Sequence, residues 1–311
     1  MTTPMTPLEL LQRVPSALLV VLGSIAYGLL LQGLVRKIFA RVQGRIGPPL
    51  VQPFIDLFKV MFLRTAIQHG VMNVLGPVFR AVGGVGLVLL VPLVVGSPAL
   101  SGFSFSGDLL LVLYFVFFGS LGMALGASDA GHPHSPIAVS RGLSQMTAYE
   151  LPFALAVIAL AAGAESFSIS DIVEAQRGGL PHWHLVTQPF AAIAAFVAFL
   201  GMTMYSPFDI VGAPQEIPGG PPIEYNATFQ SLLMTGRATF GVAKLVLFMD
   251  LFLGGATTLL EALVKTFAIY LWAVFIGAVF PRFRTEQSIR FFLKWPTLSG
   301  LVAVAVAAYA S

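Results

Sequence analysis

Apolar residues in this chain are gathered into blocks that are long enough to cross a lipid bilayer. A spanning helix needs roughly 20 apolar residues, because it rises only about 1.5 Å per residue. Lipid cannot satisfy backbone amides, so each block should be a helix, and the short alternating segments of a membrane β-barrel are absent. We predict an all-α integral membrane protein in which residues 1–311 form a single membrane domain. Its eight spans are expected at about 14–35, 71–96, 108–127, 142–163, 186–205, 228–252, 258–280 and 297–310.

Composition supports this interpretation. Hydrophobic residues make up 57% of the chain and charged residues 10%, whereas a soluble domain averages about 45–50% apolar and about a quarter charged. The absence of cysteine excludes thiolate metal sites and iron–sulfur clusters within this chain. The first residues lack a basic n-region, so we expect the first apolar block to remain as a span rather than to be cleaved as a signal.

Basic residues predict the orientation. Eleven of them lie in the loops after the first, third and seventh spans, and only Arg13 and Arg177 lie on the other side. The positive-inside rule therefore makes the basic side cytoplasmic and puts both termini outside. The polar loop 206–225 then lies on the cytoplasmic side.

A shorter amphipathic segment follows the first span. Within Pro49–Leu63, Gln52, Asp56 and Lys59 share one helical face, and an opposite face is apolar. The segment is too short to cross the bilayer, so the pattern predicts a helix lying in the membrane interface, with a plain linker as the alternative.

The loop 206–225 has an unusual composition. It contains three carboxylates, Asp209, Glu216 and Glu224, and five prolines, but neither lysine nor arginine. An acidic loop on the positive side of a membrane is expected to pack against protein.

Ionisable residues within the predicted spans are functional candidates, because each costs a few kcal/mol at membrane depth. Glu150 is the foremost, because Pro152 cannot donate to the carbonyl of Ala148 and should leave a free acceptor beside the carboxylate. Burial would favour its protonated form, which suits reversible proton uptake. The alternative is a structural ion pair with Arg237 or Lys244.

The other intramembrane charges suggest a hydrated path. Arg237 and Lys244 are seven residues apart and share one helical face, whereas Glu261 and Lys265, four apart, should pair locally in a mainly structural role. Arg80 and Asp250 lie near span ends and are assigned no role.

Several motifs are interpreted as structural. The pairs His132/His134 and His182/His184 have no third ligand nearby, so we expect solvent-exposed loop histidines. The glycines at 83, 84 and 86 follow no strand and predict helix packing rather than phosphate binding. We therefore expect no catalytic, metal or cofactor-binding residue in this chain, and no nucleic-acid partner.

Four stretches together resemble one family. They are the run 40–59, which reads ARVQGRIGPPLVQPFIDLFK, the run from Ser140 to Glu150, the run from Pro207 to Tyr225, and PRFRTEQ at 281–287. Their order and spacing resemble the H subunit of respiratory complex I and its relatives in membrane-bound [NiFe] hydrogenases.

The resemblance implies a membrane anchor between a cytoplasmic electron-transfer arm and antiporter-like ion-pumping subunits. It would be a non-catalytic or co-catalytic subunit, in a prokaryotic cytoplasmic membrane, that couples redox chemistry to proton or sodium translocation. The [NiFe] and iron–sulfur centres would belong to the partner large and small subunits of the arm. The implied coupling path comprises Glu150, Asp209, Glu216, Glu224, Arg237, Lys244 and Lys265. The implied docking surface comprises Arg36, Lys37, Arg41, Arg45, Asp56, Lys59, Arg141 and Tyr225.

The third stretch departs from the quinone-reducing members. Met202 and Tyr205 stand where those members carry Glu and Arg, and Gly212 and Pro214 stand where they carry acids. This disfavours a bound quinone and favours the hydrogenase-type branch, which includes formate hydrogenlyase. The alternatives are a quinone-site H subunit of complex I and a stand-alone proton-coupled transporter, which the missing internal repeat disfavours.

Overall fold

The structure, a computed structural model, describes residues 7–64, 70–97, 100, 102–103, 105–212, 216–217 and 219–310, and its regular secondary structure in these ranges is helical throughout. The first six helices in chain order are α1 (Pro7–Val42), α2 (Gln52–Met61), α3 (Val71–Leu90), α4 (Asp108–Ser128), α5 (His134–Gly163) and α6 (Ile169–Ala175). A 3-10 turn (Leu180–His182) and the short α7 (His184–Thr187) follow. The chain then continues through α8 (Pro189–Thr203), α9 (Ala227–Phe252), α10 (Leu259–Val279) and α11 (Thr285–Ala310).

Seven helices in the described ranges are long and apolar enough to cross a membrane, namely α1, α3, α4, α5, α9, α10 and α11. The remaining predicted span, at 186–205, corresponds to α8, which is apolar but only 15 residues long. The prediction of an all-helical, multi-pass membrane protein is confirmed. Pro214, one of the residues used in the sequence comparison, lies outside the described residues.

Several boundaries differ from those predicted. Helix α5 begins at His134 rather than 142, and α11 begins at Thr285 rather than 297. Both extensions carry charged and polar residues. The apolar span is therefore shorter than the hydrogen-bonded helix that contains it. Helix α3 ends at Leu90 rather than 96, and Val91 is already extended.

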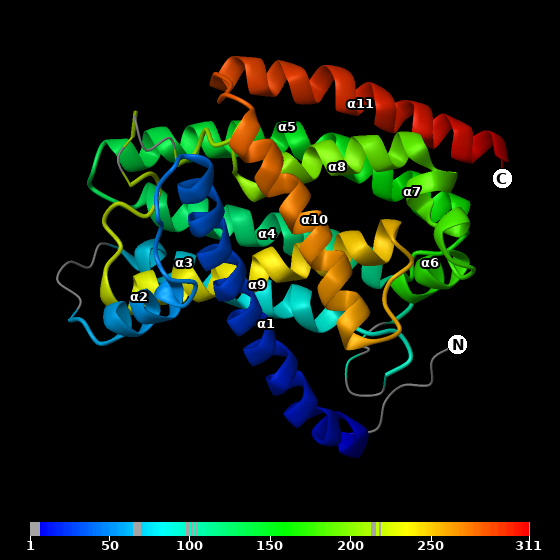
Figure 1. Ribbon diagram of the computed structural model, residues 1–311, viewed down its shortest axis with the longest axis horizontal. Coiled ribbons are helices and arrows are strands. Elements are labelled where there is room, and N and C mark those ends of the chain that lie inside the picture. Colours follow the sequence, from blue (N-terminus) through cyan, green and yellow to red (C-terminus); the bar gives the residue numbers. More distant parts are fainter. Residues whose placement is uncertain are drawn as a thin grey trace.

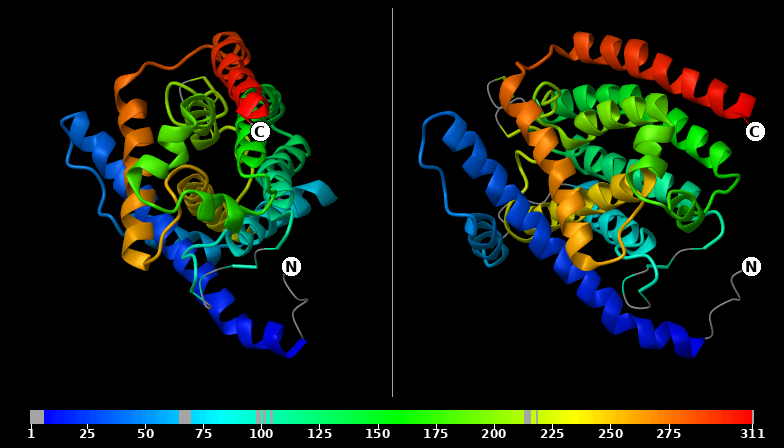
Figure 2. Two further views of the ribbon diagram at one scale, coloured as in Figure 1. Left: turned by 90° about the vertical axis from the view of Figure 1, so that its right-hand side faces the viewer. Right: turned by 45° about the vertical axis from the view of Figure 1, so that its right-hand side comes forward.

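The helices pack as a bundle of nearly parallel elements. Helix α5 lies along both α8 and α11, while α3 packs between α4 and α9. Helices α1 and α10 cross this bundle obliquely (Figures 1 and 2). Aromatic rings fill the centre, where Phe153 of α5 stacks on Phe248 of α9 with centroids 5.4 Å apart.

Connections gather at the two ends of the bundle. At one end, Arg13 Nη1 donates to Gly102 O (3.4 Å), Val95 N to Ala256 O (2.9 Å) and Leu109 N to Phe167 O (3.2 Å). The other end, on the left of Figure 1, carries the connection from α1 to α2 and the loop 206–225; we call it the loop end. Helix α11 ends away from it, on the side where Arg13 of α1 makes its bond, as the predicted topology requires.

Helix α2 has apolar side chains facing in two directions. Leu57 is buried against Leu29 of α1 and Ala238 of α9, whereas Phe58 and Phe62 are exposed. The amphipathic helix is confirmed, but its apolar residues serve both packing and an outward surface. Gly33 permits the approach, because a Cβ there would overlap the carbonyl of Leu50.

Candidate functional site

The loop 206–225 is fixed to the bundle near its first residues. Ser206 Oγ donates to Phe280 O (2.6 Å), and Phe283 N donates to Pro207 O (2.9 Å). Phe208 is buried, and its ring packs on that of Phe292 with centroids 4.5 Å apart. The loop therefore begins as part of the protein core.

Glu216 forms an ion-pair clamp at the loop end. One carboxylate oxygen accepts from Arg141 Nη1 of α5 (2.7 Å), and the other accepts from Arg282, between α10 and α11. The Arg141 hydrogen bond, aided by the charge of Arg282, holds the pKa of Glu216 below its ordinary value. The clamp joins the loop to two elements that are far apart in sequence.

The end of the loop is held by α4 and α5. Glu224 Oε2 accepts from the amide of Gly131 (2.9 Å), and Ser135 Oγ donates to Pro221 O (3.1 Å). Tyr225, predicted on the docking surface, is instead buried. Its hydroxyl packs against Gly126. Only glycine fits there, because a Cβ at this position would be 2.5 Å from the hydroxyl oxygen.

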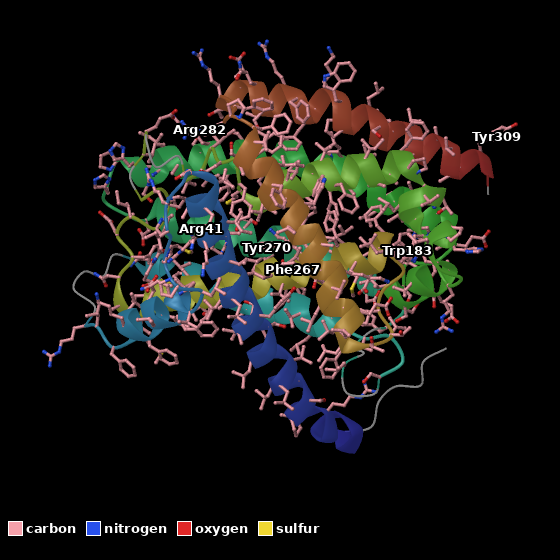
Figure 3. The ribbon with its side chains drawn as sticks, in the orientation of Figure 1. Arg41, Trp183, Phe267, Tyr270, Arg282 and Tyr309 are labelled. Atoms are coloured by element: carbon pink, nitrogen blue, oxygen red, sulfur yellow. The ribbon has the colours of Figure 1, made fainter. Side chains whose placement is uncertain are left out.

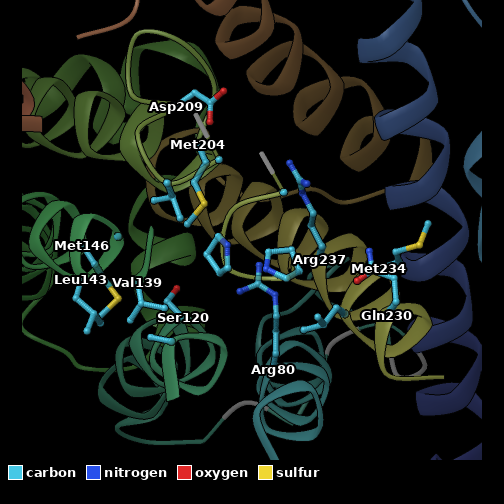
Figure 4. Close-up of a pocket in the computed structure, with 18 of the residues that line it drawn as sticks. Arg80, Ser120, Val139, Leu143, Met146, Met204, Asp209, Gln230, Met234 and Arg237 are labelled. Atoms are coloured by element: carbon cyan, nitrogen blue, oxygen red, sulfur yellow. The ribbon is translucent and has the colours of Figure 1, made fainter. Parts of the chain in front are cut away.

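A cavity of about 230 Å³ lies beneath the loop; we call it the loop cavity (Figure 4). Arg80 of α3 and Arg237 of α9 line it together with Asp209 of the loop. Asp209 lies over Gly212, where an added Cβ would be 2.9 Å from its Oδ1. A larger residue at position 212 would therefore displace this carboxylate.

A second cavity, of about 90 Å³, shares Arg80, Ser120, Met204 and Arg237 with the first and reaches Lys244 and Tyr270. We call it the deep cavity. The hydroxyls of Tyr205 and Tyr270 lie 3.1 Å apart, and Tyr270 donates to Leu31 O (2.9 Å). The two cavities thus adjoin one another, and together they extend from the loop into the bundle.

The ring of Phe240 lies against two cations of this region. Its centroid lies 5.7 Å from the guanidinium carbon of Arg80 and 5.6 Å from Lys244 Nζ. These distances allow cation–π attraction. Gly119 of α4 makes room for the ring, because a Cβ there would overlap it.

Glu150 of α5 stands near Lys244, which acts on it electrostatically. Its Oε1 is buried and makes no hydrogen bond within the part of the chain that the structure describes. The ion pairs of the described residues do not include one from Glu150 to Arg237 or Lys244. The geometry suits a carboxylate that exchanges a proton better than one that is locked in a pair.

Lys265 lies apart from these cavities, at the end opposite the loop. Its Nζ contacts Glu261 (2.7 Å) and donates to Leu253 O (2.8 Å) and Gly255 O (2.7 Å). The indole of Trp183 lies 4.6 Å away. The local pairing with Glu261 predicted from the four-residue spacing is confirmed.

The basic residues predicted for docking gather at the loop end, where Figure 3 shows Arg41 and Arg282 on the side opposite Trp183. Arg36 Nη1 donates to Asp56 (2.8 Å), and Gln52 Nε2 donates to its other oxygen (2.8 Å). Both bonds lower the pKa of Asp56, with Gln52 the larger cause. The exposed members of the set are Arg36, Arg41, Arg45 and Lys59, while Lys37 and Arg141 are half-buried.

Of the four histidines predicted to be solvent-exposed, His132 and His134 are half-buried, and His134 begins α5. His184 is buried, and its Nδ1 lies 3.0 Å from Leu251 O. The adjacent Trp183 begins the turn of α7, which folds His184 under α9. His182 is exposed, as expected. No group of three or more potential metal ligands occurs among the described residues.

Sequence reasoning missed several cavity residues. Arg80, which was assigned no role, lines both cavities, and so does Ser120 of α4. Tyr205 was noted only as a departure from a motif, and Tyr270 was not noted. A signal existed for Arg80, since a cation followed by the glycines at 83 and 84 marks a helix face that another helix approaches closely.

Comparisons with known proteins agree with this architecture. A family model described as NADH dehydrogenase matches residues 15–308. The H subunit of the NADH-quinone oxidoreductase of Anoxybacillus flavithermus is 26% identical over 88% of this chain and 85% of its own length. The corresponding protein of Chelativorans sp. is 29% identical over 88% of this chain and 87% of its own.

A solved structure is also similar. A chain of the membrane-bound sulfane sulfur reductase, an archaeal respiratory membrane complex, superposes with a TM-score of 0.87. It is 33% identical, and the match covers 94% of this chain and 98% of that one.

Proposed function

This chain belongs to the NADH dehydrogenase family, and from that premise we propose that it is the membrane anchor of a hydrogenase-type respiratory complex. It is a membrane subunit of the kind found in complex I and in related respiratory complexes. In the proposed role it links a cytoplasmic arm, carrying [NiFe]-type and iron–sulfur subunits, to antiporter-like pumping subunits in a prokaryotic cytoplasmic membrane. It couples redox chemistry in the arm to proton or sodium translocation.

The observation that carries the proposal is the joining of loop and cavities at one end of the bundle. Exposed cations of the α1–α2 region lie at the same end as the loop. A soluble arm docked there would press on a loop whose carboxylate Glu216 is clamped to Arg141 and Arg282. Beneath the loop, the two cavities lead from Asp209 past Arg237 to Lys244.

The proposed coupling path therefore has two parts. Asp209, Arg237, Lys244 and Glu150 form the part that exchanges charge, because they line or adjoin the cavities. Glu216 and Glu224 act through the position of the loop, since each is engaged in a contact with another element. Lys265 would take part in the path at the opposite end of the bundle, outside the cavities.

A quinone-site subunit of NADH:quinone oxidoreductase is the second candidate, and the names of the curated relatives favour it. Against it stand Met202 and Tyr205 in place of the motif's charged residues, and the two arginines that line the loop cavity. Family membership argues against the third candidate, a stand-alone transporter.

Purification tests the proposal directly. The tagged protein, extracted in mild detergent, should bring with it a [NiFe]-type large subunit, an iron–sulfur small subunit and antiporter-like subunits, identified by mass spectrometry. Co-purification of NADH-oxidising subunits, with activity sensitive to quinone-site inhibitors, would favour the second candidate. A chain that migrates alone would exclude both anchor roles.

A further inference from the structure

Two guanidinium groups share the loop cavity. Arg80 extends from α3 and Arg237 from α9 into the same space (Figure 4). The two helices touch at this point, since a Cβ at Gly236 would lie 3.3 Å from Arg80 Cγ. The adjacent residue is Arg237, so like charges are held close together by the packing of the helices.

Neither arginine has a carboxylate partner within the described residues. The ion pairs there involve other arginines, and Arg80 lies against the aromatic ring of Phe240. Lys244 is a third cation and lies against the same ring of Phe240. Its Nζ donates a long hydrogen bond to Met202 O (3.4 Å). Positive charges at membrane depth are costly when nothing compensates them.

Arg237 combines a place at membrane depth with an exposed side chain. Arg237 lies ten residues into α9, about 15 Å along a helix that is long and apolar enough to span the membrane. Its side chain is nevertheless exposed in this chain. The cavity therefore connects with the surroundings of the protein, and an ion can enter it.

The lining suits an oxyanion. Guanidinium groups present forked donors that match the oxygens of phosphate, and Ser120 and Gln230 add polar side chains to the wall. A cavity of about 230 Å³ has room for a phosphate group. Asp209 lines the same cavity and can offset one of the two guanidinium charges, so a neutral ligand would leave the other uncompensated.

We propose that Arg80 and Arg237 bind a phosphate-class anion in the loop cavity, supplied either by the headgroup of an anionic membrane lipid or by free phosphate. Together with Asp209, the anion offsets the charges of the two arginines, and it fills the space beneath the loop. The site does not depend on the proposed function, since its basis is the lining of this chain's own cavity.

Phosphorus analysis tests the site on the protein in the complex with which it purifies. After exhaustive detergent exchange into phosphate-free buffer, wild type should retain a stoichiometric excess of phosphorus over the double variant Arg80→Gln/Arg237→Gln. The matched control Arg177→Gln, which removes an exposed arginine outside the cavity, should retain as much as wild type. Extraction into organic solvent identifies a lipid source, and recovery in the aqueous phase identifies free phosphate.

Thermal unfolding gives a second readout, because a ligand that binds only the native state raises the midpoint temperature. Inorganic phosphate, or vesicles containing phosphatidylglycerol in place of phosphatidylcholine, should raise the midpoint of the delipidated wild-type protein. The charge-conserving Arg237→Lys should keep most of this response if the double variant fails to assemble. Equal phosphorus in wild type and double variant, or no response of wild type to either probe, would overturn the proposal.

Discussion

Gly119 of α4 and the ring of Phe240 of α9 are in direct contact, so that no side chain can be placed on the glycine without moving the ring. The ring in turn supports Arg80 and Lys244. A packing detail between two helices thus determines where two cations of the cavities lie.

Replacing this glycine should destabilise the bundle. Gly119→Ala forces the ring or the helix to shift, which costs about 1–3 kcal/mol for overpacking and should lower the midpoint of thermal unfolding in detergent. Gly241→Ala is the matched control, because it is also helical but a Cβ there meets nothing within 4 Å. A midpoint for Gly119→Ala that equals that of the control would show that the ring is not held as described.

The clamp at Glu216 should control the order of the loop. Glu216→Gln removes the charge that joins Arg141 to Arg282, so amide exchange in residues 207–222 should become faster. Glu286→Gln breaks an exposed pair with Arg290 on α11 and should leave the loop unchanged. Equal exchange in the two variants would contradict the clamp.

Lowering the pH should accelerate amide exchange in the loop, as Glu216→Gln does. Because the folded protein lowers the pKa of Glu216, the clamp contributes fully above the ordinary value of 4.5 and is lost as the pH falls through the lowered value. Loop exchange measured against pH should accelerate in that acidic range in wild type. In Glu216→Gln this contribution to the pH dependence should be missing.

Glu150 should be required for translocation but not for assembly. Glu150→Gln keeps the shape of the side chain and removes its ionisation, so ion translocation by the complex in vesicles should fall about tenfold or more. The subunit composition should be unchanged. Glu165→Gln, an exposed carboxylate just beyond the end of the same helix, provides the control. Unchanged pumping in Glu150→Gln would exclude Glu150 from the path.

Arg45 should contribute to docking of the soluble arm. Arg45→Ala removes an exposed cation from the loop end, and loss of one surface charge corresponds to at most about fivefold in affinity. The salt concentration that releases half of the arm from membranes should therefore fall. Arg177→Ala, an exposed arginine at the opposite end, should release the arm at the wild-type salt concentration. Identical release by both variants would argue against docking at Arg45.

The sequence predicted the spans well because hydropathy and helix length are both local properties. It also identified the elements that meet at the loop end, since orientation follows from the distribution of Lys and Arg. It could not predict that Glu216 joins Arg141 to Arg282, because those contacts depend on helices that approach only after folding. For the same reason Tyr225 was expected on the surface, although Gly126 provides it with a buried position.

The cavities could not be predicted from the sequence. A cavity is the space that side chains from several helices leave unfilled, so it appears in no single stretch of residues. Arg80 illustrates this, because the sequence placed it near a span end. It lies instead at the middle of α3, where α9 brings Gly236 and Arg237 beside it.

Helix α5 has a mechanical consequence. It runs without interruption from His134 to Gly163, with Arg141 in the clamp and Glu150 nine residues further on. The two side chains are therefore separated by about 13.5 Å of rigid helix. A docked arm that pulls on the loop would draw the start of α5 with it, and Pro152, which lacks an amide donor, lies just beyond Glu150 as a natural hinge. The signal would then reach Glu150 as a tilt of one rod, alongside the exchange of charge through the cavities.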